Sequence, residues 1–252
     1  MLELAATAGV TTPPARLERV GTKPVLLMDR FDREGSDVRV PFMSAMTALD
    51  AKDHSEDRSY IEILDVIRQF GAFPKEDARQ LWRRMAFNVL VSNTDDHLRN
   101  HGFLWAGEGW RLAPAYDMNP SPPHINPRIH VLALNELDHT SSIDTVMAVS
   151  KDFGLALGEA KAIAGEVAAA VSGWKTAAAK TRLSKDDIAF MADAFEHDDL
   201  RTALSFGSAT RPPVSGSAKG KTGKPSPGAP KATRRAPPKR GAPRKRSASG
   251  GK

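Results

Sequence analysis

The chain has 252 residues, no cysteine and a formal net charge of +6. The absence of cysteine excludes a disulfide framework and a thiolate metal site. No window approaches the roughly 18 consecutive apolar residues of a membrane span. The first residues lack the basic start of a signal peptide, so we expect a cytoplasmic protein.

The positive charge belongs to one end of the chain. Of the 36 Lys and Arg residues, 13 follow position 210, where there is no Asp or Glu, so residues 1–210 hold 23 basic and 30 acidic residues. The end segment consists mainly of Pro, Gly, Ser, Ala, Lys and Arg, a composition that cannot bury enough apolar surface to fold. We therefore predict a folded part, residues 1–206, and a disordered basic tail, residues 207–252. Such a tail binds nucleic acid weakly through its charge, or serves only as a solubilising extension.

The first part of the folded region is expected to contain the end of a helix, a strand and an irregular segment, in that order. Residues 1–10 read as the end of a helix that Gly9 closes. The apolar run from Val25 to Met28 is typical of a buried strand that enters a charged turn. Residues 34–58 are polar and predict irregular structure.

Two helices are expected next. The first covers residues 59–70, with Tyr60, Ile63, Ile67 and Phe70 on its core face and Gly71 as its stop. The second runs from Pro74 to about Val91. Its core-facing stripe comprises Ala78, Leu81, Trp82, Met85 and Val89.

The second half predicts a hairpin and two more helices. Residues 101–105 and 109–117 read as two short strands joined by a turn, and Ile129 to Leu134 is a further candidate strand. Helical stripes follow at Ile163, Val167, Val171 and Trp174, and at Ile188, Met191 and Phe195. Ser184 and Asp187 resemble a capping box. The predicted fold is mainly α with one small β-hairpin.

A polar cluster, SNTDDHLRNHGFLW at residues 92–105, interrupts this apolar pattern. Asp95 precedes Asn100 by five residues, and the predicted hairpin brings back a second acid, Asp117. A phosphoryl-transfer site needs one carboxylate to accept the proton of the attacking hydroxyl, and an amide and a second carboxylate to hold Mg²⁺. These oxygen ligands suit Mg²⁺ better than Zn²⁺.

Simpler interpretations of the same residues stay open. Asp95 and Asp96 are also what a solvated loop after a helix would contain. His97 is either an ordinary hydrogen-bonding residue or a group that orients Asp95 or touches phosphate, and Arg99 faces a carboxylate, a phosphate or a surface ion pair. A zinc site of the HEXXH type is excluded because His97 and His101 have no Glu at position 98. Trp105 and Trp110 are expected to pack within the hairpin.

The stretches MDRFDR (28–33), FNVLVSNTDDHLRNHGFLW (87–105) and WRLAPAYDMNP (110–120) resemble the HipA family of bacterial serine/threonine kinases. Members of this family are the toxins of HipBA-type toxin–antitoxin pairs. The resemblance covers about residues 1–205. It implies the helical C-terminal lobe of a HipA-like, protein-kinase-like fold, with a small β-hairpin that carries the metal-binding Asp.

The resemblance also implies roles for individual residues, with ATP and Mg²⁺ as cofactors. Asp95 would be the catalytic base, and Asn100 and Asp117 the metal ligands. The residues that would bind the nucleotide are Asp29, Arg30, Phe31, His97, Leu98, Arg99, Asn100, Tyr116 and Asp117. Asp29 stands where the family commonly has Glu, so its shorter side chain is expected to weaken a contact to adenine.

One departure from the family concerns the start of the chain. Family members carry an N-terminal lobe with a phosphate-covering loop and a nucleotide-binding lysine, and this sequence begins after the place where both are expected. Our leading hypothesis is a protein serine/threonine kinase with a HipB-like antitoxin as partner. Its N-terminal lobe is either supplied by another chain or lost, which leaves a remnant with residual nucleotide or partner binding. The alternatives are a catalytically silent module that docks an antitoxin or another chain, and a body that the basic tail tethers to DNA or RNA.

Overall fold

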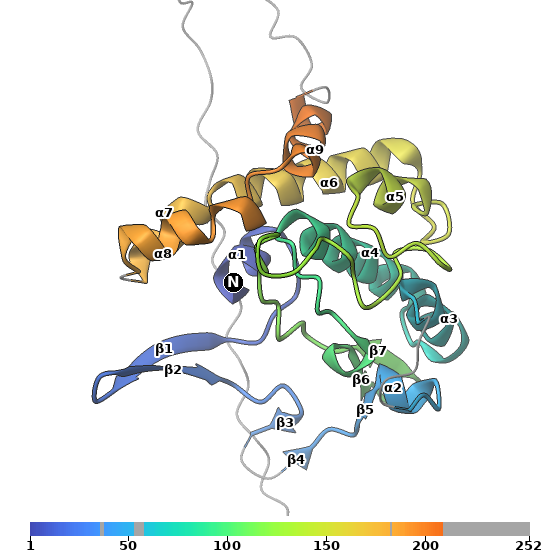
Figure 1. Ribbon diagram of the computed structural model, residues 1–252. Coiled ribbons are helices and arrows are strands. Elements are labelled where there is room, and N and C mark those ends of the chain that lie inside the picture. Colours follow the sequence, from blue (N-terminus) through green and yellow to red (C-terminus); the bar gives the residue numbers. More distant parts are fainter. Residues whose placement is uncertain (36–37, 53–57, 182, 209–252) are drawn as a thin grey trace, which may run out of the picture. The chain divides into compact units, whose positions relative to one another are not determined.

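The computed structural model describes residues 1–35, 38–52, 58–181 and 183–208. All of them belong to one compact unit, Met1–Pro212 (Figure 1). The predicted tail lies outside the described residues, apart from its first two positions. Its predicted disorder and its boundary therefore stay predictions.

Helices form most of the regular secondary structure of this unit. In chain order they are α1 (Leu2–Thr7), α2 (Ala45–Ala48), α3 (Tyr60–Phe70), α4 (Pro74–Leu90), α5 (Ile143–Ala148), α6 (Leu157–Ser172), α7 (Trp174–Lys180), α8 (Lys185–Phe190) and α9 (Asp198–Ser208). Two short 3₁₀ turns, η1 (Leu98–Asn100) and η2 (Ala192–Ala194), complete the helical part. The helix-rich prediction is thus confirmed.

The strands form three small antiparallel sheets among the described residues. A ribbon pairs β1 (Ala15–Val20) with β2 (Lys23–Met28), and a second one pairs β3 (Arg33–Glu34) with β4 (Val38–Arg39). The third sheet has the order β5 (Phe42–Ser44), β6 (Gly102–Trp105), β7 (Trp110–Leu112). The predicted hairpin is present as β6–β7, but its second strand ends at Leu112 instead of Asp117, so the hairpin itself does not carry that acid. Strand β5 comes from a segment that was expected to be irregular.

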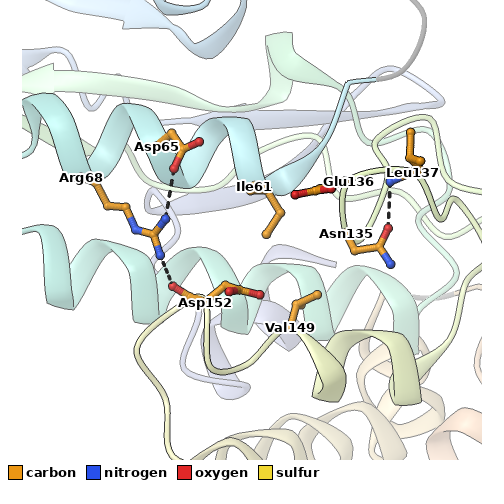
Figure 2. Close-up of a pocket in the computed structure, with 8 residues that line it drawn as sticks. All are labelled: Ile61, Asp65, Arg68, Asn135, Glu136, Leu137, Val149 and Asp152. Carbon is orange, nitrogen blue, oxygen red and sulfur yellow. Dashed lines mark hydrogen bonds and ion pairs between the residues drawn. The ribbon is translucent and has the colours of Figure 1, made fainter.

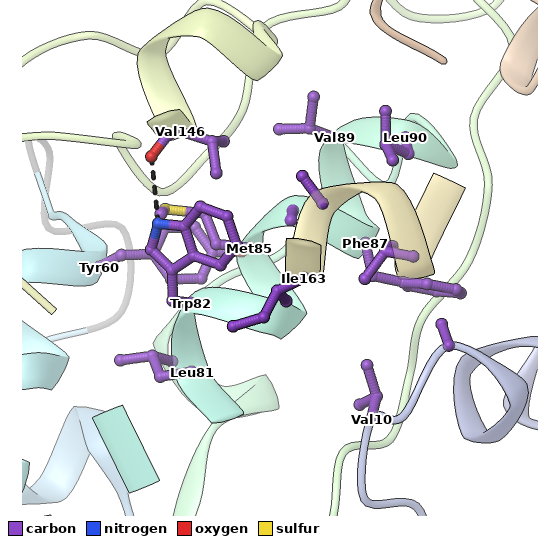
Figure 3. Close-up of a cluster of buried hydrophobic side chains, with 14 of the residues drawn as sticks. Val10, Tyr60, Leu81, Trp82, Met85, Phe87, Val89, Leu90, Val146 and Ile163 are labelled. Carbon is purple, nitrogen blue, oxygen red and sulfur yellow. Dashed lines mark hydrogen bonds between the residues drawn. The ribbon is translucent and has the colours of Figure 1, made fainter. Parts of the chain in front are cut away.

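Helix α4 is the centre of the core, with α3 and α5 packed against it as well as α6 (Figure 1). All five residues of its predicted stripe are buried. Trp82 is fully buried, and its indole N–H donates to the carbonyl of Val146 in α5 over 3.1 Å (Figure 3). This bond satisfies the polar atom of a large buried ring. The spacing of apolar residues in the sequence therefore correctly predicted which face of α4 is buried.

The two ends of α3 follow ordinary helix signals. Ser59 and Glu62 form a capping box at its start, which satisfies two free N–H groups. Gly71 is the residue at which the helix ends, and its N–H donates to the carbonyl of Ile67. The prediction that Phe70 is buried was wrong, because its side chain is 47% exposed.

Other sequence predictions were wrong in ways that packing explains. The run Val25–Met28 does form a strand, but its side chains are exposed or half-buried, because it lies in a two-stranded ribbon. Residues 129–134 form only isolated bridges, at Ile129 with Thr140 and at Ala133 with Ser59. The predicted stripe over 188–195 is divided, because α8 ends at Phe190 and η2 follows. The capping box at Ser184 is confirmed.

Candidate active site

The polar cluster after α4 is a loop whose start is firmly held. Ser92 has a left-handed backbone with φ of 52°, and its hydroxyl donates to the carbonyl of Ala194 over 2.9 Å. The amide of Asn93 donates to the side-chain oxygen of Asn88 over 3.1 Å. Both Ser92 and Asn93 are buried. The loop therefore leaves α4 along a path that side-chain hydrogen bonds fix.

The next residues run alongside the segment that contains Val131 and Leu132. The N–H of Val131 donates to the carbonyl of Thr94 over 2.9 Å, and that of Leu132 to the carbonyl of Asp96 over 3.2 Å. Thr94 and Asp95 lie in a turn, and these two bonds hold the backbone on either side of Asp95. Asp95 lies between these two bonds, and its side chain is exposed. The candidate base is therefore accessible to a substrate.

Asp96 has the opposite environment. It is 3% exposed, and its Oδ2 accepts hydrogen bonds from Asn88 Nδ2 over 3.0 Å and from the hydroxyl of Tyr60. The ring Nε2 of His101 also lies 2.8 Å from this oxygen. The amide of Asn88 bonds to the hydroxyl of Tyr60 as well, over 3.0 Å. The simpler interpretation, that both acids are exposed to solvent, is therefore wrong for Asp96. It agrees with the structure for Asp95, which is exposed.

The charges in this buried network shift its pKa values. Burial by itself would raise the pKa of Asp96, but the charge and hydrogen bond of His101 and the hydrogen bond from Tyr60 leave it lowered. Burial and the neighbouring Asp96 raise the pKa of Tyr60 well above its usual value. Burial also lowers the pKa of Arg84 to about 10, although Asp96 opposes this shift. Asp96 is therefore an anion held inside the protein by its donors and by nearby positive charge.

The segment that carries Asp117 lies beside this loop, because hydrogen bonds join the two on either side of it. The hydroxyl of Tyr116 donates to the carbonyl of Arg99 over 2.7 Å. The N–H of Ser121 donates to the carbonyl of Ser92 over 3.0 Å. The second acid predicted for the site is thus brought to the loop that contains the first.

Asp117 has an unusual backbone. Its φ is 55°, and among the described residues only Asp50 and Ser92 share a positive φ without being glycine. Two of these three residues therefore lie in the two adjoining loops, and left-handed residues of this kind cluster at functional sites. The carboxylate of Asp117 is exposed, and its Oδ1 accepts a bond from Asn119 over 2.6 Å.

A pocket of about 310 Å³ opens next to Tyr116. Its wall combines residues 28–32 with two aromatic side chains from other segments. The ring of Phe31 stacks on that of Tyr116 with 5.8 Å between centroids and lies 6.0 Å from that of Phe42. The lining residues are Met28, Asp29, Arg30, Phe31, Asp32, Phe42 and Tyr116. The residues predicted to contact adenine and the residue next to Asp117 therefore line one cavity.

Two polar residues of this pocket are already engaged. Arg30 donates to both carboxylate oxygens of Asp32 over 2.9 and 2.7 Å, and these bonds lower the pKa of Asp32 to about 2. The N–H of Asp29 donates to the carbonyl of Pro14 over 2.9 Å. The side chain of Asp29 is exposed.

Residues 97–100 join the loop to β6. Leu98 and Asn100 are buried, and the N–H of Asn100 donates to the carbonyl of His97 over 2.9 Å. Arg99 is exposed and lies 3.3 Å from the His97 ring through Nη2. The ring of His97 thus contacts a guanidinium.

Sequence reasoning missed the residues that support the loop. Tyr60 and Asn88 were read as parts of helices, and His101 was considered only for zinc. The signal that could have identified Asn88 is an amide within the otherwise apolar run FNVL near the end of α4. Because a buried polar group needs a partner, such a residue indicates a polar network nearby.

A second cavity, of about 570 Å³, lies elsewhere in the unit (Figure 2). Arg68 of α3 pairs with the carboxylate of Asp65 on the same helix and reaches across to the backbone carbonyl of Asp152. The side chain of Asn135 accepts a bond from the N–H of Leu137 over 2.8 Å. None of the predicted site residues lines this cavity.

Comparison with known proteins identifies the family of the chain and agrees with the fold. The model of the HipA-like C-terminal domain matches residues 1–174. The chain belongs to this family. The resemblance noted from the sequence is therefore confirmed.

Individual relatives are more distant. The sequence is 25% identical over 140 residues to the "Putative kinase Y4mE" of Sinorhizobium fredii, a match that covers 51% of this chain and 33% of the relative. The HipA of Shewanella oneidensis, solved with HipB and its operator DNA, superposes with a TM-score of 0.62 at 17% identity. That match covers 82% of this HipA-like chain and 54% of the Shewanella one.

The proinflammatory kinase CtkA of Helicobacter pylori has a similar fold. It superposes with a TM-score of 0.57 at 13% identity and covers 82% of this chain and 84% of its own. The chain thus spans a third of Y4mE and about half of the Shewanella HipA. Within the part that the structure describes, no helix is long and apolar enough to cross a membrane.

Proposed function

We propose that this chain is the C-terminal lobe of a HipA-like protein serine/threonine kinase, which transfers the γ-phosphate of ATP to a protein hydroxyl. The observation that carries the proposal is the pair of hydrogen bonds that holds the Asp117 segment along the loop of Asp95 and Asn100. This arrangement occurs within the motif of a family whose relatives are named kinases. The toxin role in a toxin–antitoxin pair belongs to the same proposal.

Asp95 is the proposed catalytic base. Its exposed carboxylate would accept the proton of the substrate hydroxyl as that oxygen attacks phosphorus. A base must be accessible and also held still, since catalysis of this reaction consists mainly of positioning and charge stabilisation. The backbone bonds on either side of Asp95 supply that fixed position.

Asn100 and Asp117 are the proposed ligands of Mg²⁺. Among the described residues no three His, Cys, Asp or Glu side chains gather into a metal site, so a metal here needs oxygen atoms from other sources. Mg²⁺ in kinases is held in this way, by one or two protein oxygens together with phosphate and water. The exposed carboxylate of Asp117 fits this requirement. When bound, the ion would neutralise the negative charge of the phosphates.

The pocket beside Tyr116 is the proposed site of the adenine ring. Its stacked aromatic side chains and its volume of about 310 Å³ suit a flat heterocycle. Asp29, Arg30 and Phe31 would border the base. His97, Leu98 and Arg99 would lie along the phosphates.

Nucleotide binding provides the first test, because it can be measured independently of phosphate transfer. Calorimetric titration of the 252-residue chain with ATP should show binding that strengthens when Mg²⁺ is added. Asp117→Asn should remove the Mg²⁺ effect, whereas Asp186→Asn, which changes an exposed acid in α8, should leave it intact. Equal Mg²⁺ effects in wild type and Asp117→Asn would exclude Asp117 as a metal ligand.

Phosphate transfer provides the second test. With radiolabelled ATP and a bacterial lysate as acceptor, wild type should label protein Ser or Thr, and Asp95→Ala should label at least about 100-fold less. Equal incorporation by the two proteins would discard Asp95 as the base. ATP binding by wild type without any transfer would favour the catalytically silent module.

The proposed partners are a HipB-like antitoxin and, through the basic tail, nucleic acid. The related Shewanella HipA was solved with HipB and operator DNA, and the tail contributes 13 positive charges without an acid. Removal of residues 211–252 should abolish the salt-sensitive retention of the chain on a DNA column. Unchanged retention would show that the tail does not bind nucleic acid.

A further inference from the structure

Two adjacent acids in the candidate active site have opposite environments. Asp95 is exposed, whereas the side chain of Asp96 is 3% exposed and accepts hydrogen bonds from other elements. We propose that Asp96 is the positioning residue of the site: its buried carboxylate holds the loop in the form that directs Asp95 toward the substrate. This inference rests on the proposed role of Asp95.

The donors to Asp96 come from three separate segments. Tyr60 is the first residue of α3, Asn88 lies in the last turn of α4, and His101 directly precedes β6. All three contact the same oxygen, Oδ2. The carboxylate therefore ties the loop to two core helices and to the central strand of the three-stranded sheet at one point.

Fixing Asp96 also fixes Asp95. The carbonyls of Thr94 and Asp96 both accept hydrogen bonds from the segment of residues 131–132, and Thr94 and Asp95 lie in a turn. Asp95 is therefore bracketed by these two bonds and directly precedes the buried Asp96, while its own side chain is exposed.

The network favours a carboxylate over a neutral side chain at position 96. A carboxylate only accepts hydrogen bonds, and its charge strengthens each of them. An asparagine would offer a neutral oxygen and would place an N–H₂ group among groups that are themselves donors. The positive charge of Arg84 and the ring of His130 act on the same carboxylate. Loss of the anion would leave this positive charge without its partner inside the protein.

The experiment compares two buried carboxylates. Asp77 is also 3% exposed, but it accepts bonds from Arg111 and from the N–H of Leu112, both in β7 and neither within residues 92–101. Hydrogen–deuterium exchange of the full chain should be about tenfold faster across residues 92–101 in Asp96→Asn than in wild type. In Asp77→Asn that segment should exchange as in wild type.

Kinetic measurements distinguish a role of Asp96 in positioning Asp95 from a role in keeping the protein folded. Asp96→Asn should lower kcat at least about tenfold while KM for ATP and the number of ATP molecules bound per chain stay unchanged. A purely structural role would instead reduce the number of ATP molecules bound. Asp77→Asn should change kcat less than about threefold.

Each outcome decides the proposal. Exchange at wild-type rates across residues 92–101 in Asp96→Asn would overturn it. If that variant does not fold, Tyr60→Phe removes one donor and keeps the ring, and unchanged exchange in this variant would overturn the proposal as well. If wild type transfers no phosphate, or Asp95→Ala transfers as well as wild type, the proposed function fails, and the exchange data still show whether Asp96 holds the loop.

Discussion

His130 gives the structure a testable dependence on pH. It is 2% exposed, and its Nε2 lies 3.0 Å from the hydroxyl of Ser141. Burial lowers its pKa from 6.5 to about 4, against the attraction of Asp96, while the charge of Arg128 adds to the decrease. The charge of His139 lowers this pKa further and that of Asp199 raises it. The charged groups around the ring therefore do not cancel the effect of burial on the pKa.

The sign of the effect follows from these values. As the pH falls below 6.5, the unfolded chain takes up a proton at His130, whereas the folded protein does so only near pH 4. The free energy of unfolding therefore decreases through this window, and the contribution is fully present only above pH 6.5. Between pH 6.5 and about pH 5 the pH changes by about 1.5 units, and each unit costs about 1.4 kcal/mol. The free energy of unfolding should therefore fall by about 2 kcal/mol because of His130.

The assay is urea unfolding, followed by tryptophan fluorescence, at about pH 7 and about pH 5. His130→Gln can keep the contact to Ser141 but cannot take up a proton, so its loss of stability on acidification should be about 2 kcal/mol smaller than in wild type. His197, whose pKa burial also lowers to about 4, contributes equally to both proteins. His124→Gln, at an exposed position, serves as the control and should behave as wild type. If wild type and His130→Gln lose equal stability, the reasoning about the buried ring is wrong.

Two further predictions concern packing. Trp82→Phe leaves a cavity and removes the donor to the Val146 carbonyl. In urea titrations it should lower the free energy of unfolding by about 2–4 kcal/mol. The same change at Trp105, which is exposed, should alter that free energy by less than about 1 kcal/mol. Gly102→Ala would place a methyl group against the ring of Phe42, which lines the proposed adenine pocket, so calorimetry should find ATP binding weakened about tenfold. Gly158→Ala, with open space at its Cβ, should bind ATP as wild type does; equal affinities in all three proteins would contradict the second prediction.

The sequence predicted the elements that follow a single period or an end signal. The apolar stripe of α4 and the glycine after α3 depend on residues close in the chain, and both are present in the structure. The hairpin β6–β7 was predicted for the same reason, and Trp105 and Trp110 pack in it edge to face with 5.4 Å between ring centroids. These features need only local information.

The features that were missed depend on contacts between distant residues. Nothing in the dipeptide Asp95–Asp96 indicates which acid is buried, because the donor that decides it, Tyr60, lies 36 residues earlier. The exposure of Leu26 and Met28 likewise depends on what covers the ribbon β1–β2, and an apolar run by itself does not report this. Residues 131–132 were read as a strand because they are apolar, and they serve instead as the backbone support of the loop.

The residues proposed for the candidate site came from short stretches of the sequence. The family motif indicated Asp95, Asp117 and residues 29–31, because each lies in a short motif, and their roles stay predictions. The network under the loop was not predicted. Its members are spread over α3, α4 and the start of β6, and only the folded structure brings them together.

The contact between α6 and α9 determines how force applied at the end of α9 would reach the rest of the folded unit. A Cβ at Gly165 would lie 2.8 Å from the Cα of Gly207, so the two helices touch through their backbones. Asp199 of α9 also pairs with Arg128 over 2.6 Å. A pull on the end of α9 would therefore load a close contact between two helix backbones and an ion pair, so the helix acts as a stiff anchor rather than a loose hinge.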